Sequence, residues 1–499
     1  MSLASAINTA QTIFSNTATQ TGVVAKNIAN SGNGDYVRRL AMMGVDSQGQ
    51  YYIKIQRAQD DALFKANIAS ISGSSAQSSL LGGLEQLKTV YGGNDYPTSP
   101  SSYLSAFRTA LQTFAASPSN ITVASSTVAD AKDLANSLNS ASNALQLARS
   151  DTDKEITEQV TKLNEYLKAF EGVNNTIVGN LATGKDASDA LDQRDKLLKQ
   201  ISEVVGISTV VRKNMDTVIY SSDGTVLFET VPRKVEFTPI DTYDATIEKG
   251  GAILVDGVPL KAGTGGNTTA EGTLASLLQF RDDVTPTMQA QLDEIARGLI
   301  TMFAEKDPNP SAPPALPDKV GLFTWADGTI PASSTLTVGL AASIKVNPAV
   351  DADPRLLRDG GINGADYSSN PIVPPATSPN SAFTDLLDKY IVALDTPMSF
   401  DTNTTAGGTS TKLTGTSSII AYASSSIGWL EQLRKAATTA NDNKTAMLSK
   451  TDQSLSNATG VSLDEELAMM LDLEQSYKAS AKLLSTVDEM MKTLLDTVR

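Results

Sequence analysis

The chain has 499 residues, which is enough for several domains and more than one buried core. Its 55 acidic residues outnumber its 40 basic residues, so the formal net charge is −15. Such a balance argues against nucleic acid and against an anionic membrane surface as partners, because both are bound through basic side chains. The chain contains no Cys and no His, which excludes disulfides, thiolate nucleophiles, the usual zinc sites and imidazole bases.

The N-terminal segment is apolar in one stripe and lacks charge. No ionisable side chain occurs from Met1 to Ala25, and no secretory signal peptide or membrane-length apolar run is visible. Apolar and small side chains step by four and three residues alternately, at Leu3, Ile7, Ala10, Phe14, Thr17, Thr21, Val24 and Ile28. This heptad spacing predicts an amphipathic helix with one apolar stripe.

Helical segments dominate the next part of the chain. After a turn at SGNGD, alternation around residues 51–55 predicts a short strand. Helical spacing then covers about 58–91, followed by a short helix that stops before Pro118. Residues 119–171 contain neither Gly nor Pro, and a helix of that length would extend roughly 80 Å. Another helix is predicted over about 186–205.

The centre of the chain changes character. Residues 207–262 alternate apolar and polar side chains and contain the turns SSDG and VDG, which predicts a β-rich insertion. A helix is predicted over 273–304, with Pro286 as a kink or break. Proline-rich loops follow, together with a predicted strand over 335–346 and a long helix over 416–456.

The C-terminus repeats the heptad spacing of the N-terminus. Its stripe consists of Met470, Leu473, Tyr477, Ser480, Leu484, Val487, Met491, Leu494 and Val498. Two interpretations of the terminal stripes are open. They are either two helices of an ordinary bundle, or terminal helices that pack on each other and on neighbouring subunits.

Clustered carboxylates raise the question of catalysis, since paired acids can hydrolyse glycosides. The acids at 464–466 open a helix, where negative charge favours the positive end of the helix dipole. Asp192 with Lys196, and Asp195 with Lys199, have the spacing of ion pairs on a solvated helix face. The sequence therefore offers no pair of convergent acids for the alternative of a secreted carboxylate hydrolase.

Stretches near the two ends of the chain carry recognisable motifs. The stretch NIANSGNGDYVRR contains a signature at Asn27, Ala29, Asn30, Tyr36 and Arg38. It resembles the N-terminal signature of flagellar rod, hook and hook-associated axial proteins, although the usual Thr-Pro-Gly before the Tyr is Asn-Gly-Asp here. The stretch from GVSLDEEL to the C-terminus is similar to the shared C-terminus of the same family.

Motifs in the middle of the chain narrow this resemblance. The stretch LDQRDKLLKQISEVVGI, which includes Asp192, Arg194 and Asp195, resembles the hook-associated branch that forms the hook–filament junction. EGTLASLLQFRDDVTP and VNPAVDADPRLL resemble later pieces of that branch, in the same order. The alternative within the family is a hook or rod subunit.

The resemblance implies a function and a location. It implies a structural subunit of the bacterial flagellum, not an enzyme and without a cofactor, which is secreted through the type III export apparatus of the flagellum. The implied partners are further copies of the chain, the hook protein, a second hook–filament junction protein, and an export chaperone at the C-terminal helix.

We therefore predict a mainly α fold with a β-rich insertion, arranged as an elongated multi-domain rod. The predicted domains are a terminal coiled-coil-like assembly domain (1–45 and 457–499), a long helical rod domain (46–206, 267–308 and 380–456) and a β-rich outer domain (207–266 and 309–379). The predicted assembly interface consists of the apolar residues of both stripes. We also expect the terminal helices to stay disordered in the free subunit, because each stripe lacks a partner until neighbours arrive.

Overall fold

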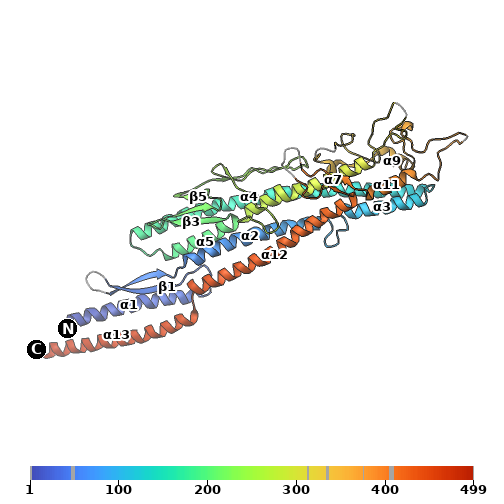
Figure 1. Ribbon diagram of the computed structural model, residues 1–499. Coiled ribbons are helices and arrows are strands. Elements are labelled where there is room, and N and C mark those ends of the chain that lie inside the picture. Colours follow the sequence, from blue (N-terminus) through green and yellow to red (C-terminus); the bar gives the residue numbers. More distant parts are fainter. Residues whose placement is uncertain are drawn as a thin grey trace. The chain divides into compact units, whose positions relative to one another are not determined.

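The computed structural model describes residues 3–45, 51–311, 314–332, 336–374, 376–403 and 410–497. The fold is mainly helical with small sheets (Figure 1), which confirms the predicted fold class at this level. The chain forms two compact units. Unit 1 consists of Met1–Ser75, Lys162–Val235 and Asn443–Arg499, and unit 2 consists of Ala76–Thr161 and Glu236–Asp442. The elongated rod and its three-domain division stay predictions.

The long helices follow the periodicity of the sequence. The helices are α1 (Leu3–Ala29), α2 (Asp61–Val90), α3 (Pro100–Ala116), α4 (Ile121–Ala182), α5 (Ser188–Val204), α6 (Thr273–Gln279), α7 (Thr285–Met302), α8 (Leu340–Ser343), α9 (Pro348–Ala352), α10 (Leu356–Asp359), α11 (Asp385–Asp395), α12 (Ile419–Thr459) and α13 (Leu463–Thr497). A π-helix, η1 (Phe280–Val284), joins α6 to α7, and η2 (Ala365–Tyr367) is a 3-10 turn. α4 runs through Gly172 and Gly179, so it is longer than the Gly-free stretch that predicted it.

The strands form several small antiparallel sheets. They are β1 (Arg39–Val45), β2 (Tyr51–Arg57), β3 (Ile207–Val211), β4 (Thr217–Ser221), β5 (Val226–Glu229), β6 (Val231–Pro232), β7 (Val235–Glu236), β8 (Leu254–Val255), β9 (Val258–Pro259), β10 (Phe323–Thr324), β11 (Lys345–Val346), β12 (Met398–Ser399) and β13 (Thr416–Ser417). β1 and β2 form a hairpin, and the largest sheet has the order β3-β4-β5-β6. These strands confirm the β-rich character of the segment after residue 206.

Two local predictions differ from the structure. The strand predicted over 335–346 is confined to β11, and the preceding residues form helix α8. The residue before this helix, Gly339, has a left-handed backbone conformation. Pro286 does not break its helix. It lies in the first turn of α7, where the missing N–H costs little, and the π turn η1 accommodates it.

A cluster of aromatic side chains lies in the core of unit 2. The rings of Phe107, Phe303 and Phe323 contact one another with centroid separations of 5.4–5.9 Å, and the ring of Tyr390 lies tilted against that of Phe303 with the centroids 4.6 Å apart. These residues come from α3, the position directly after α7, β10 and α11. With few aromatics in the chain, this cluster joins segments that are far apart in sequence.

The central helix α7 is buried on all sides, including its polar residues. Gln289 accepts hydrogen bonds from Ser142 (2.8 Å) and Gln146 (3.0 Å). Arg297 is paired with Glu294 at 2.7 Å and donates to the carbonyl of Ser399 at 2.7 Å. Because buried polar groups are costly without partners, these bonds fix which segments surround the helix.

A buried arginine anchors the loops of unit 2 to its helices. Arg281, in η1, is 0% exposed and is paired with Asp153 of α4 at 2.7 Å. The same guanidinium binds Asp282 and the carbonyl of Gly251, each at 2.7 Å. The second oxygen of Asp153 accepts from the Tyr243 hydroxyl at 3.0 Å. The pair therefore ties α4, η1 and the segment around 243–251 together.

Asp293 ties α8 to α7. Its carboxylate accepts hydrogen bonds from the backbone N–H groups of Gly339 (2.9 Å) and Ala341 (2.8 Å), and from Gln289 (3.0 Å). Complete burial raises the pKa of Asp293 to about 7, although these three hydrogen bonds oppose the shift. This carboxylate explains why the residues after Gly339 are helical, since it binds the free N–H groups at the helix start.

In unit 1, the sheet β3-β4-β5-β6 packs on the C-terminal part of α4. Phe170 of α4 contacts Phe228 of β5 edge-on, with centroids 4.9 Å apart. The side chain of Asn174 bonds both Asp216 (2.7 Å) and the N–H of Thr217 (3.0 Å) at the start of β4. Figure 1 shows these strands beside α4 and α5.

No helix in the described ranges combines the length and the apolar character needed to cross a bilayer.

Replacing Arg281 with Met is expected to lower the free energy of unfolding of unit 2 by about 3–5 kcal/mol, because Asp153 would be left as a buried, unpaired charge. Urea unfolding followed by the fluorescence of Trp325 and Trp429, both in unit 2, would measure it. Arg355→Met is the control, since its partner Asp353 and Arg355 itself are exposed, and it should cost less than about 1 kcal/mol. Equal effects of the two substitutions would contradict the assignment.

Asp293 is expected to make the stability of unit 2 fall with rising pH. Its pKa is raised in the folded state, so the folded protein binds its proton more tightly, and this contribution is lost as pH rises from about 4 to about 7. Relative to Asp293→Asn, the wild type should lose on the order of 1 kcal/mol per pH unit in this window. Urea unfolding of both proteins at pH 5 and pH 7.5 measures the free energy of unfolding of each, and a wild type that gains stability relative to Asp293→Asn between these two pH values would refute the effect.

Candidate assembly site

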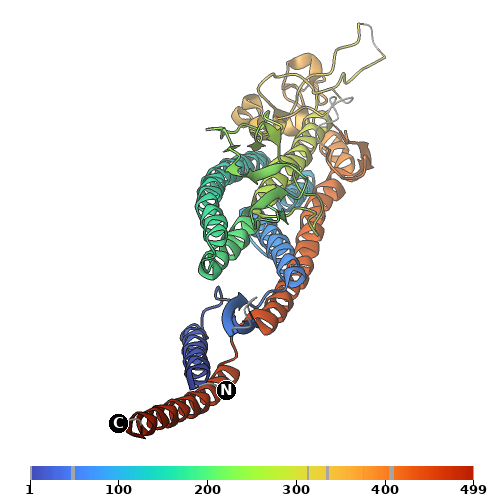
Figure 2. The same ribbon diagram turned by 90° about the vertical axis from the view of Figure 1, so that its left-hand side faces the viewer.

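The two terminal helices lie side by side in unit 1. α1 and α13 pack along each other, as Figures 1 and 2 show. The clearest contact joins the rings of Phe14 and Tyr477, whose centroids are 4.8 Å apart. Both residues belong to the stripes predicted from heptad spacing. The apolar stripes at the two ends of the chain therefore face each other at this contact.

The predicted assembly residues occupy different environments. Ala10, Val24 and Val487 are buried, and Ile7, Phe14, Ile28, Met470, Leu473 and Leu484 are half-buried. Tyr477 and Met491 are exposed by 44% and 38%. Leu3 and Leu494 lie within α1 and α13, and Val498 lies outside the described residues. The predicted stripes are thus buried or half-buried at most of their described positions, and exposed at Tyr477 and Met491.

The arrangement differs from the expectation that each stripe lacks a partner within the subunit. Both helices are formed, and they bury part of their apolar surface against each other. α13 nevertheless exposes further apolar side chains that the stripe did not include, namely Leu463, Leu467, Met469, Leu471, Leu483 and Met490. Since exposed apolar rows of this extent mark interaction surfaces, the helix pair has apolar surface left for another partner.

Asn27, at the end of α1, is the centre of a buried polar cluster. Its side-chain amide donates to the carbonyl of Arg39 (2.9 Å) and accepts from the Arg39 N–H (3.0 Å), so it pairs with β1 as a neighbouring strand would. It also accepts from the Tyr36 hydroxyl at 2.8 Å and donates to Glu466 at 3.0 Å. One side chain therefore joins α1, β1 and α13.

Glu466 connects the C-terminal helix to the N-terminal signature. Its second carboxylate oxygen accepts from Nε of Arg38 at 2.6 Å, and Arg38 also pairs with Glu465 at 2.9 Å. The backbone N–H of Arg38 donates to the carbonyl of Thr459 at the end of α12. Glu466 lies in the first turn of α13, as predicted, but it is buried and holds two partners from the other end of the chain.

Acidic residues of α5 complete the cluster. Asp192 is paired with both Arg39 and Arg57, the latter at 2.9 Å, and Asp195 is paired with Arg57 at 2.5 Å. The prediction of solvated pairs with Lys196 and Lys199 was wrong, because the β1–β2 hairpin covers this face of α5 and brings its arginines onto the acids. Lys196 instead pairs with Asp35 at 2.8 Å.

Burial and charge shift the pKa values of this cluster in opposite directions. Burial raises the pKa of Asp192, while the hydrogen bond from Arg39 and the charge of Arg57 oppose the rise. Burial also raises the pKa of Tyr36 to about 12, so its hydroxyl stays protonated and can donate to Asn27. A hydrogen bond from Lys26 lowers the pKa of Asp189 at the edge of the cluster.

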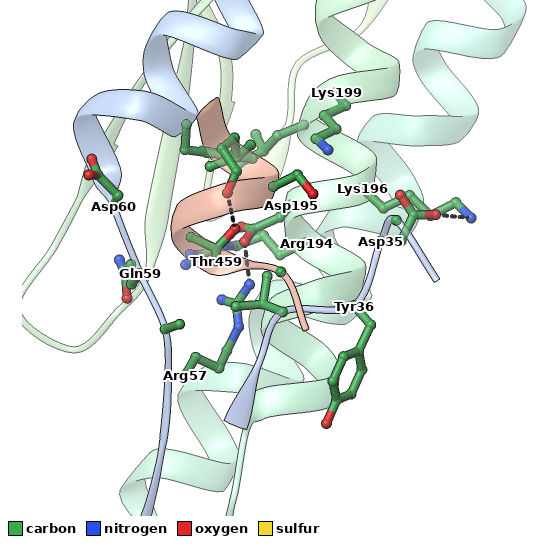
Figure 3. Close-up of a pocket in the computed structure, with 18 of the residues that line it drawn as sticks. Asp35, Tyr36, Arg57, Gln59, Asp60, Arg194, Asp195, Lys196, Lys199 and Thr459 are labelled. Atoms are coloured by element: carbon green, nitrogen blue, oxygen red, sulfur yellow. Dashed lines mark hydrogen bonds and ion pairs between the residues drawn. The ribbon is translucent and has the colours of Figure 1, made fainter. Parts of the chain in front are cut away.

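A cavity of about 700 Å³ opens beside the cluster (Figure 3). Arg57, Arg194 and Asp195 line it, together with the start of α2, the end of α12 and residues Thr209–Val211 of β3. Arg194 donates to the hydroxyl of Thr217 at 3.1 Å, inside unit 1. The signature residues from two distant stretches of sequence are therefore close together in space.

Comparisons with known proteins show similarity to flagellar proteins in two regions of the chain. The model of the flagellar hook-associated protein FlgK helical domain matches residues 84–307, and the model of the flagellar basal body rod FlgEFG protein C-terminal matches residues 452–497. The central helical region of the chain is thus similar to the helical domain of the hook-associated protein FlgK, and its C-terminal segment is similar to the C-terminal part of flagellar rod proteins. The FlgK family is a family of structural proteins.

Individual relatives are distant. Flagellar hook-associated protein 1 of Salmonella typhimurium is 26% identical over 230 residues, which cover 42% of this chain and 40% of that protein. The protein of the same name from Bacillus subtilis is 22% identical over 419 residues, covering 79% and 76%. The structure of the flagellar hook junction protein FlgK from Burkholderia pseudomallei aligns with a TM-score of 0.41 and 19% identity, over 56% of each chain.

The FlgK match includes Asp192, Arg194 and Asp195, and the rod-protein match includes Glu466 and all of α13. The N-terminal signature lies outside both ranges. In the structure, Asn27, Tyr36 and Arg38 belong to the cluster. Asn30 caps the end of α1, because its side-chain amide donates to the carbonyl of Lys26, and Ala29 is exposed.

Sequence reasoning missed Arg39 and Arg57, which pair with the acids of α5. Arg39 immediately follows the signature, and Arg57 ends the alternating segment after it. Neither position carries a local signal for an ion pair with a helix more than 130 residues away in sequence. Only the approach of the hairpin to α5 reveals them.

Replacing Asn27 with Asp is expected to loosen the junction of α1, β1 and α13. The new carboxylate cannot donate to Arg39 or Glu466 and would lie beside the buried Glu466 carboxylate, at a cost of about 3 kcal/mol. Hydrogen exchange should accelerate in peptides from 27–45 and from the start of α13. Asn30→Asp is the matched control, because Asn30 bonds only nearby residues of its own turn. Unchanged exchange in Asn27→Asp would count against the role of this amide.

Proposed function

We propose that the protein is a structural subunit of the bacterial flagellum that forms the junction between hook and filament. The match of its central helical region to the FlgK family carries this proposal. The protein would be secreted and would lie outside the cell in the flagellum, exported through the type III apparatus. Its partners would be further copies of itself, the hook protein, a second hook–filament junction protein, and an export chaperone at α13.

Assembly would proceed through the terminal helices, which pair as a coiled-coil-like domain. α1 and α13 already bury their inward stripes against each other, while α13 exposes six further large apolar side chains. Burying these side chains between neighbouring copies would contribute on the order of 10 kcal/mol before ordering costs. The remaining helices would form the rod domain, and the β-rich segments would face outward.

A hook or rod subunit is the second candidate, because the C-terminal match is to rod proteins. That segment contains α13 and is the part that axial proteins share. The central match favours the hook-associated branch over this candidate. A deletion strain would separate the two, since loss of a junction protein leaves hooks in place and releases unassembled flagellin into the medium.

Replacing Leu484 with Asp is expected to prevent assembly, because it places a charge between α1 and α13. In a deletion strain that carries this variant, hooks should form without filaments, and flagellin should appear in the medium. The sheet β3-β4-β5-β6 should remain folded, which hydrogen exchange would show.

Ser485→Asp is the matched control, because Ser485 is the exposed neighbour of Leu484 on the same helix and receives the same charge. It should support normal filaments. Filaments of normal length on hooks that carry Leu484→Asp would reject assembly through the terminal helices.

A further inference from the structure

One edge of the hairpin strand β1 has no neighbouring strand. The backbone N–H and C=O of Arg39 both bond the side chain of Asn27, so they point away from β2. Since alternate residues of an antiparallel strand point the same way, the backbone groups of Ala41 and Met43 also point outward. In the described part of the chain, neither residue has a hydrogen-bond partner at this edge.

A second free edge belongs to β3, which lies at the border of its sheet. Arg212 donates to the carbonyl of Asp216, and Ser222 donates to that of Gly206, which fixes the bonded positions of the β3–β4 ladder. The backbone groups of Thr209 and Val211 therefore point away from β4. No partner for these outward groups is found among the residues that the structure describes.

The side chain of Asn27 covers the edge of β1 at Arg39, and β3 is only five residues long, but the remaining positions of both edges are not covered by a strand. Natural proteins protect edges with charged side chains, prolines or bulges. β1 begins with Arg39, whose charge is bound to Asp192. Its remaining residues Leu-Ala-Met-Met-Gly-Val (40–45) and the sequence Ile-Ser-Thr-Val-Val of β3 have no charge and no proline. Apolar side chains are exposed on both, with Met43 at 60% and Val211 at 46%. Two apolar, unguarded edges on one chain indicate strand pairing with another molecule.

The surroundings of β3 suit the side chains of β1. Thr209, Val210 and Val211 line the cavity of about 700 Å³, and Phe64, Leu198 and Leu455 add apolar surface to it. β1 contributes Met43, whose unbranched side chain fills irregular cavities well, while its neighbour Met42 points to the other face of the strand. The cavity beside β3 can therefore receive side chains from an added strand.

We propose that β1 of one copy adds to the free edge of β3 in a neighbouring copy. The two edges are different surfaces of the same chain, so the contact is head-to-tail and repeats from copy to copy in a ring or a helical row. Pairing of β1 with β1 would instead close at a dimer. The inference rests on the proposed function in that it requires copies of this chain to lie next to one another.

Cysteine cross-linking tests this pairing, because the chain contains no cysteine of its own. Full-length Met43→Cys would be combined in turn with Thr209→Cys and with Val211→Cys, to allow for either register. Facing side chains of paired strands are close enough for a disulfide. Oxidation of flagella isolated from complemented deletion strains should give a ladder of linked subunits with at least one pair.

Met43→Cys with Val258→Cys is the matched control, because Val258 is as exposed as Val211 but lies on another sheet. It should give no ladder. A linked dimer from Met43→Cys alone would show β1–β1 pairing and overturn the proposal, as would the absence of a ladder from both test pairs.

Proline at position 43 gives an independent test. Met43→Pro removes the outward N–H of β1 but no bond of the hairpin, since edge strands tolerate proline where the N–H faces out. It would be combined with the cysteine pair that fits the linked antiparallel register, which is Ala41→Cys with Val211→Cys if Met43 links to Thr209, and Val45→Cys with Thr209→Cys if Met43 links to Val211. The proline should reduce cross-linking at least tenfold relative to that pair alone, while hydrogen exchange in α1 stays unchanged. Undiminished cross-linking would contradict strand pairing.

The result can be separated from the test of the proposed function. If Leu484→Asp abolishes filaments while neither cysteine pair cross-links in the otherwise unaltered protein, assembly through the terminal helices stands and the β1–β3 contact fails. If Leu484→Asp leaves filaments normal, the proposed mode of assembly itself fails.

Discussion

The arrangement of unit 1 at the chain ends depends on a single buried amide. Asn27 presents a donor and an acceptor to Arg39, as a neighbouring strand would, and uses its remaining capacity for Glu466 and Tyr36. An amide can do this because it offers both kinds of group without a charge. Because Asn27 lies at the end of α1 and bonds both β1 and α13, it fixes the position of the two terminal helices relative to the β1–β2 hairpin.

The charges around this amide explain why the hairpin has a definite place. Arg39 and Arg57 lie at the two ends of paired strands and meet the carboxylates of Asp192 and Asp195 on α5. Buried ion pairs add little net stability, but separating them is costly, because each leaves a charge without a partner. The hairpin is therefore held in one register against α5, and its outer edge is presented in a defined direction.

The two units differ in how they are stabilised. In unit 2, α7 and η1 are buried among aromatic side chains and polar bonds such as the Arg281–Asp153 pair. In unit 1, α1 and α13 contribute one shared stripe and leave apolar surface exposed. Elements with fewer buried contacts open at lower free energy, so α1 and α13 are expected to open more readily than α7 and η1.

The sequence by itself determined the helices at both ends, the long helices between them and the β-rich segment, because these depend on local periodicity. It also marked Asn27, Tyr36, Arg38 and Asp192 through a family resemblance. Only the tertiary structure decided what those residues contact. It brought Arg39 and Glu466 to Asn27, and it buried Asp192, which its spacing had placed on a solvated face. It also formed a helix after Gly339, where the carboxylate of Asp293 binds the backbone N–H groups. Such contacts join residues hundreds of positions apart, and no local pattern encodes them.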